Sequence, residues 1–151
     1  MISFKDLKEI LSITIKWEGK LKDFYDVAEF ALSNNESKKV ISGLRNNLLK
    51  NLDVLKNIDF KNYGKTQWVR YASDYRDDEL IPIRKVTRDS TPEEIFNQIL
   101  EYQTKLKEFY SMIVSKLISV KQKELFESLV AFEDEQIFET KRFMESFIPG
   151  K

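Results

Sequence analysis

Two long stretches of the chain, roughly residues 3–58 and 91–147, carry almost nothing that would stop a helix. The prolines are Pro82, Pro92 and Pro149, and Pro92 stands at the head of the second stretch, where the first helical position tolerates it. Apolar residues recur in both stretches at steps of three and four, which is the spacing of one helix face. The sequence therefore predicts an all-α fold.

Each stretch is broken near its middle by residues that favour a turn and a helix cap. Residues 33–36 (SNNE) break the first stretch, and residues 119–121 (SVK) break the second. Thr91 and Glu94 form a capping-box pattern at the start of the second stretch. We therefore expect two antiparallel helical hairpins, at 3–58 and 91–147, within a single domain spanning 1–151.

An internal repeat relates the two hairpins. Residues 20–25 (KLKDFY) match residues 105–110 (KLKEFY) at an offset of 85, and the same offset pairs Leu32 with Leu117. A shared amphipathic pattern could produce some of these matches by chance. The near-identity around the Phe-Tyr pair favours duplication of one hairpin.

Residues 59–90 join the hairpins and are too many for a structureless loop in a compact domain. Trp68, Tyr71 and Tyr75 have helical spacing, and residues 80–83 (LIPI) are typical of an extended apolar segment. Arginines between these aromatics would suit single-stranded nucleic acid, but acidic residues are mixed among them. We therefore expect a crossover connector that packs on the bundle and binds no nucleic acid.

Composition excludes several kinds of chemistry. The chain has no Cys and no His, so disulfides, thiol nucleophiles, His general bases and His-ligated zinc are all impossible. Lys plus Arg equals Asp plus Glu at 25 each, which gives no overall field for nucleic acid or membrane. Without an apolar run of membrane length or a signal-peptide core at the start, we expect a cytoplasmic protein.

Polar residues interrupt the apolar stripe of every predicted helix. They are Glu18, Asn51, Gln103, Glu133 and Gln136. The pairs Glu18 with Asn51 and Gln103 with Gln136 each lie about 25 Å from the turn of their hairpin, which predicts one polar layer across the middle of the core. A lone buried carboxylate is costly, so Glu18 and Glu133 must be protonated, hydrogen-bonded, hydrated or bound to a cation.

This pattern resembles the rubrerythrin and ferritin families over nearly the whole chain. Rubrerythrin-like helices place a Glu seven positions before the Tyr of a Phe-Tyr pair, as Glu18 stands before residues 24–25. In the second hairpin Gln103 takes that position before residues 109–110. The resemblance implies a ferritin-like four-helix bundle, built from two repeated antiparallel hairpins and a long crossover, with a dinuclear metal site.

The ligands that the resemblance implies are mostly replaced. Two Glu-x-x-His pairs would fall on Leu48 and Asn51, and on Glu133 and Gln136, so that Glu18 and Glu133 are what is left of six ligands. We expect no cofactor for such a site, because two iron ions need more anionic carboxylates. The remaining donors could hold one weakly bound hard cation, Mn²⁺, Mg²⁺ or Fe²⁺; they are Glu18, Gln103, Glu133 and Gln136, with Glu101 and Glu135 as neighbours that a helix rotation could bring inward.

Two other interpretations of the polar layer stay open beside this vestigial metal site. One is a hydrogen-bonded network of Asn51, Tyr25 and Tyr110 with the carboxyl groups, which would fix helix register. The other is a site for an organic ligand. Tyr25 and Tyr110 are interpreted as packing residues rather than redox relays.

Two features bear on contacts between helices or between chains. Trp17 and Tyr102 align under the repeat and could pack between helices or at a homodimer contact. Gly19 and Gly43 lie within helices, where glycine costs about 1 kcal/mol relative to alanine, so we expect close helix approach there.

Three functions follow from this pattern. The favoured one is a rubrerythrin-like protein that has lost di-iron catalysis and acts as a binding or interaction module, with an unidentified protein partner. The second is a ferritin-like metal-dependent oxidoreductase, using Fe or Mn, that acts on peroxide or oxygen through an altered site. The third is an assembly subunit that dimerises through its connector or outer helix faces.

Overall fold

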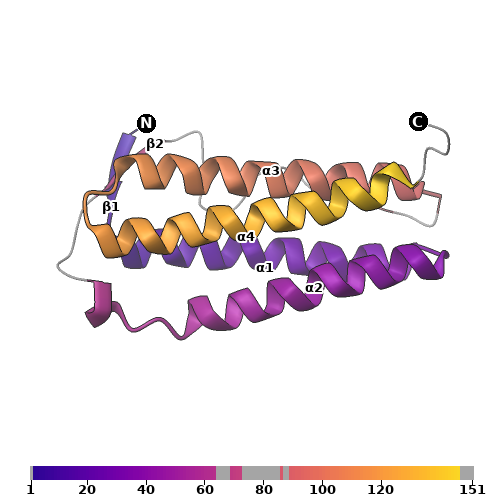
Figure 1. The fold of residues 1–151 in the computed structure, drawn as a ribbon, viewed down its shortest axis with the longest axis horizontal. Coiled ribbons are helices and arrows are strands. Elements are labelled where there is room, and N and C mark those ends of the chain that lie inside the picture. Colours follow the sequence, from indigo (N-terminus) through magenta and orange to yellow (C-terminus); the bar gives the residue numbers. More distant parts are fainter. Residues whose placement is uncertain (1, 64–68, 73–85, 87–88, 147–151) are drawn as a thin grey trace.

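The computed structural model describes residues 2–63, 69–72, 86 and 89–146, and its main feature is a bundle of long helices (Figure 1). Four α-helices are present in this part of the chain, together with a short 3₁₀ helix, η1, at Phe60–Tyr63 and two short strands. The α-helices are α1 (Leu7–Ala31), α2 (Asn35–Lys56), α3 (Pro92–Lys116) and α4 (Val120–Glu145). The predicted all-α four-helix bundle is confirmed.

Side-chain caps fix where each helix begins. The Thr91 side chain accepts a hydrogen bond from the backbone N–H of Glu94 at 3.1 Å, and the Glu94 side chain accepts one from the backbone N–H of Thr91, so the predicted capping box is present. Asn34 and Ser119 cap α2 and α4, which confirms both predicted turns. Each cap satisfies an amide that would otherwise lack a partner in the first helical turn.

The helix boundaries repeat at the offset found in the sequence. Helices α1 and α3 both have 25 residues, and they begin 85 residues apart, at Leu7 and Pro92. Asp6 forms a capping box with Glu9 at the start of α1, in the place that Thr91 and Glu94 hold for α3. The internal repeat is therefore structural as well as sequential.

The two hairpins point in opposite directions (Figure 1). Helices α1 and α4 run one way and α2 and α3 run the other, so the α1–α2 turn and the α3–α4 turn lie at opposite ends of the bundle. Close packing joins α1 to α2, α3 to α4, and α1 to α3. Because α2 ends and α3 begins at opposite ends, the intervening chain has to cover the length of the bundle.

A two-stranded antiparallel sheet, β1 (Ile2–Lys5) and β2 (Val69–Ala72), corrects two predictions. Phe4, expected in the first helix, pairs with Arg70 in the sheet, because the Asp6 cap starts the helix only at Leu7. Tyr71, expected in a helical pattern, lies in β2 opposite Ser3. Trp68, Tyr75 and residues 80–83, which belong to the same predictions, lie outside the described residues.

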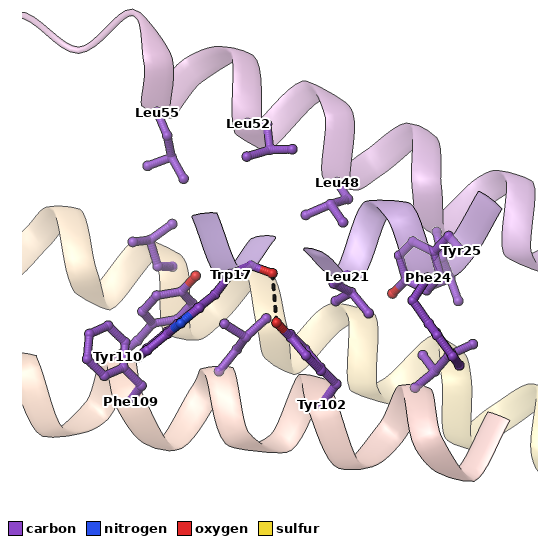
Figure 2. Close-up of a cluster of buried hydrophobic side chains, with 14 of the residues drawn as sticks. Trp17, Leu21, Phe24, Tyr25, Leu48, Leu52, Leu55, Tyr102, Phe109 and Tyr110 are labelled. Carbon is purple, nitrogen blue, oxygen red and sulfur yellow. Dashed lines mark hydrogen bonds between the residues drawn. The ribbon is translucent and has the colours of Figure 1, made fainter. Parts of the chain in front are cut away.

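The core is rich in aromatic side chains (Figure 2). Trp17 meets Phe109 edge to face at 4.7 Å between ring centroids, and the Tyr102 hydroxyl donates to the backbone oxygen of Trp17 at 3.0 Å. Trp17 and Tyr102 are fully or almost fully buried, so they pack between α1 and α3 within the chain. None of the described helices has an apolar stretch that could span a membrane.

The expected close helix approach at the two helical glycines is wrong. A Cβ atom built on Gly19 or Gly43 would meet no other atom within 4 Å, so neither position needs glycine for packing within the described chain. Both glycines then carry only the entropic cost that glycine has in a helix.

We predict that Gly19→Ala and Gly43→Ala each raise the free energy of unfolding by about 0.5–1 kcal/mol, because alanine restricts the unfolded chain without a clash. Urea denaturation would measure the change. Ala131→Gly on the exposed face of α4 is the matched control and should lower stability by a similar amount. Destabilisation by either alanine would contradict the prediction.

Candidate functional site: a buried polar layer

Five of the polar residues singled out in the sequence are almost completely buried. Glu18 and Tyr25 come from α1, Gln103 and Tyr110 from α3, and Glu133 from α4, and none is more than 1% exposed. Their helix spacing places each on the same inward stripe as the apolar core. Three helices from both hairpins therefore contribute polar groups to the interior.

Two hydrogen bonds in this layer are related by the internal repeat. The Tyr110 hydroxyl donates to Glu18 Oε1 at 2.5 Å, and Gln103 Nε2 donates to the Tyr25 hydroxyl at 3.1 Å. Under the repeat Glu18 corresponds to Gln103 and Tyr110 to Tyr25, so one contact is the counterpart of the other. The direction of donation differs, because the carboxylate only accepts whereas the carboxamide can donate.

Glu18 and Glu133 form a carboxyl pair at the centre of the layer. Burial raises the pKa of Glu133 well above its ordinary value of 4.5, and the charge of Glu18 and the hydrogen bond between the two groups raise it further. Burial also raises the pKa of Glu18, but the hydrogen bonds from Glu133 and Tyr110 oppose that rise. Of the two carboxyl groups, Glu133 is therefore the one that holds a proton more strongly.

Both tyrosines of the layer stay protonated. Burial raises the pKa of Tyr25 and of Tyr110 well above the ordinary value, and the nearby carboxyl charges of Glu133 and Glu18 add to the effect. A neutral phenol can donate a hydrogen bond, as Tyr110 does to Glu18. The arrangement is that of two hydrogen bonds, Tyr110 to Glu18 and Gln103 to Tyr25, around a buried pair of carboxyl groups.

The remaining predicted residues are less closely joined to this network. Gln136 is buried but lines a groove between α2 and α4, and Asn51 on α2 is half-buried. No hydrogen bond links either side chain to Glu18 or Glu133 within the described chain. Glu101 and Glu135, expected as neighbours that could turn inward, are both exposed.

Several buried acceptor atoms meet no N–H or hydroxyl donor in the described part of the chain. They are Glu18 Oε2, Glu133 Oε2, Gln103 Oε1 and Gln136 Oε1. Such atoms are costly unless a proton, a water molecule or a cation satisfies them. The proton on Glu133 serves the carboxyl pair, and the carboxamide oxygens still lack a partner.

The donor set does not fit a dinuclear iron centre. Nowhere in the described residues do three or more acidic side chains converge as a metal would require. Two carboxyl groups with one proton carry one negative charge, and Leu48, where the resemblance implies a carboxylate, is buried in the apolar core. Glu18, Glu133 and Gln103 could at most hold a single hard cation after loss of that proton.

Sequence reasoning missed one buried contact, which lies at the start of α4. Gln122 Nε2 donates to the backbone oxygen of Tyr63 at 3.0 Å and so ties η1 to α4. Nothing in the sequence pattern pairs Gln122 with Tyr63. Thr14, which the sequence places in the core stripe of the first helix, is fully buried on α1, and its hydroxyl has no partner in the described structure.

No protein-family model matches this chain, and no match was found among the curated proteins or the solved structures. Its function is therefore inferred from the residues of the bundle itself.

We predict that Glu133→Gln removes a pH dependence of stability. The unfolded chain releases the Glu133 proton above pH 4.5, whereas the folded protein keeps it up to the higher pKa of the folded state. Folding therefore takes up a proton between these two pKa values, and the free energy of unfolding of the wild type falls as pH rises through that window. Glu133→Gln has no carboxyl group to titrate at this position, so its free energy of unfolding should rise relative to that of the wild type by up to about 1.4 kcal/mol per pH unit across that window. Urea denaturation at several pH values would measure it.

Glu127→Gln, an exposed change on the same helix, is the control for the loss of one carboxylate. Its stability should follow the wild-type pH curve. Parallel curves for Glu133→Gln and wild type would show that Glu133 is ionised in the folded protein.

We also predict that Tyr110→Phe destabilises the fold more than Tyr25→Phe. Loss of the Tyr110 hydroxyl withdraws a donor from a buried carboxyl, at a cost of about 1–3 kcal/mol, whereas loss of the Tyr25 hydroxyl removes a bond between neutral groups, worth about 1 kcal/mol. The two tyrosines hold equivalent places in the repeat, so each variant is the control for the other. Equal costs would contradict the proposed charge of Glu18.

Proposed function

We propose that this chain is a ferritin-like, rubrerythrin-like bundle that has lost di-iron catalysis and serves in the cytoplasm as a binding or interaction module. Two features of the fold support the family. A ferritin-like bundle has one long crossover between its hairpins, and here α2 and α3 run in the same direction with their joined ends at opposite ends of the bundle. The polar layer also lies on the inward stripes where the family carries its ligands.

The observation that carries the loss of catalysis is the carboxyl pair. Glu18 already accepts hydrogen bonds from Tyr110 and Glu133, and the proton on Glu133 lowers the charge that would attract a metal ion. Apolar Leu48 and neutral Asn51 replace an anionic and a basic ligand of the family pattern. A layer of this kind fixes helix register without any metal.

Exposed apolar side chains support an interaction role. They lie on α1, α2, α4, η1 and the α3–α4 turn: Val27, Phe30, Leu49, Val54, Phe60, Ile118, Val120 and Phe138. Phe30 is 73% exposed and Ile118 84%, so both side chains would gain from burial against a partner. Partners of these faces include a second copy of the chain, as a homodimer.

A second candidate is an altered metal centre that acts on peroxide or oxygen. The unpartnered carboxylate and carboxamide oxygens of Glu18, Glu133 and Gln103 favour it, because such hard oxygen donors suit Mn²⁺ or Fe²⁺. Binding would require Glu133 to give up its proton, so affinity for a cation would rise with pH.

Anaerobic titration of metal-stripped protein with Fe²⁺, Mn²⁺ and Zn²⁺ distinguishes these functions. A binding module without a metal centre should take up none of these ions with micromolar affinity. One ion per chain, lost in Glu133→Ala, would support the altered centre, and two ions per chain would overturn our proposal. Far-UV circular dichroism checks that each sample keeps its helices.

A rebuilt site tests the family framework separately. The combined variant Gln103→Glu, Leu48→Glu, Asn51→His and Gln136→His restores the six family ligands with Glu18 and Glu133. If these positions share the geometry of a dinuclear centre, the variant should bind two ions per chain. A folded variant that binds none would contradict the ferritin-like assignment.

A further inference from the structure

A groove of about 430 Å³ lies between α2 and α4, and Gln136 is the one residue of the predicted polar layer that lines it. Asn47 lines it from α2, and α4 contributes Asp134, Glu135, Gln136, Phe138 and Glu139. The two helices are not among the closely packed pairs of the described bundle. The volume falls within the range of small-molecule sites, about 300–1,000 Å³.

The lining is acidic, and one buried side chain in it lacks a hydrogen-bond partner. Gln136 is 6% exposed, and its Oε1 meets no donor in the described part of the chain. An unpartnered carbonyl oxygen in a groove lined by three carboxylates calls for a ligand that donates hydrogen bonds and carries positive charge.

Existing ion pairs neutralise the groove only in part. Asp134 pairs with Lys107 at 2.5 Å and Glu139 with Arg142 at 2.6 Å, and all four side chains are at least 40% exposed. Such exposed pairs contribute little stability, so a bound cation can compete with them. Glu135 is exposed and makes no ion pair within the described chain, which leaves its charge available.

The spread of these groups favours an extended organic cation over a metal ion. No three acidic side chains converge on one point anywhere in the described residues, as a divalent ion would require. Phe138 is 62% exposed between the acidic positions, and its ring can hold both methylene groups and an ammonium group. A ligand with ammonium groups separated by short methylene chains matches this arrangement, because the ammonium groups can pair with Glu135 and Glu139 while the methylene groups contact Phe138.

We propose that the α2–α4 groove binds an aliphatic polyamine. One ammonium group donates to Gln136 Oε1, others pair with Glu135 and Glu139, and the methylene chain lies across Phe138. This assignment names a ligand class for the binding function proposed above, on which it rests.

Isothermal titration of the full chain with spermidine at physiological salt tests this site. The double variant Glu135→Gln, Glu139→Gln should weaken binding about tenfold, since it removes two exposed charge pairs. Glu127→Gln, an exposed carboxylate on α4 outside the groove, should change the affinity less than about twofold. Cadaverine should bind more weakly than spermidine, and butylamine more weakly still.

Three outcomes would overturn the polyamine assignment. They are no spermidine binding at millimolar concentration, equal displacement by Mg²⁺ at matched charge concentration, and equal weakening by Glu127→Gln. A lysine-rich peptide that binds more tightly than spermidine would also overturn it, since the groove would then serve a protein partner. Two metal ions per chain would contradict the proposed function, whereas failed spermidine binding in a chain that binds no metal would contradict only this ligand.

Discussion

Two glutamates from different hairpins, Glu18 and Glu133, are buried together in the core of this bundle, and burial raises the pKa of both. Full ionisation of both would place two like charges in an apolar interior, at a cost of several kcal/mol. The contact therefore exists only while α1, α3 and α4 keep the register that brings Glu18, Tyr110 and Glu133 together. A slip of one residue along any of these helices would turn a polar group toward apolar neighbours and leave its partner unsatisfied.

The internal repeat shows how this polar centre could be tolerated. Corresponding positions carry Glu18 and Gln103 in one pair of helices, and Leu48 and Glu133 in the other. Two of the four positions are therefore acidic, one is a neutral amide and one is apolar. The tyrosines are kept in both halves, so hydrogen-bonding groups persist where charge does not. The two hairpins repeat the same backbone, but they do not repeat the acidic residues. The layer therefore contains two carboxyl groups, and one proton neutralises one of them.

Much of the fold was predictable because its signals are local. Caps at Asn34, Thr91 and Ser119 depend on a few neighbouring residues, and helical periodicity depends on composition along one face. The strand at Ile2–Lys5 was missed because its partner, Val69–Ala72, is more than 60 residues away. Short strands of this kind are defined by pairing and carry little pattern of their own.

The candidate site was predictable only in part, for a related reason. Stripe positions identified Glu18, Gln103 and Glu133 as buried, since burial follows from helical phase. Which groups touch, and which one holds the proton, depends on side-chain geometry between helices that no single-helix pattern contains. Gln136 shows the difference, because it shares the stripe and yet faces the α2–α4 groove.

The opposite orientation of the two hairpins has a consequence for the order of folding. Each hairpin joins helices that are neighbours in the chain, whereas the contacts of α1 with α3 join residues about 85 positions apart. Contacts between distant residues carry the larger loop-closure cost, so the hairpins should assemble first and dock afterwards. The glutamate pair then loses contact with water only when the two hairpins dock, so the chain should take up a proton at that late step.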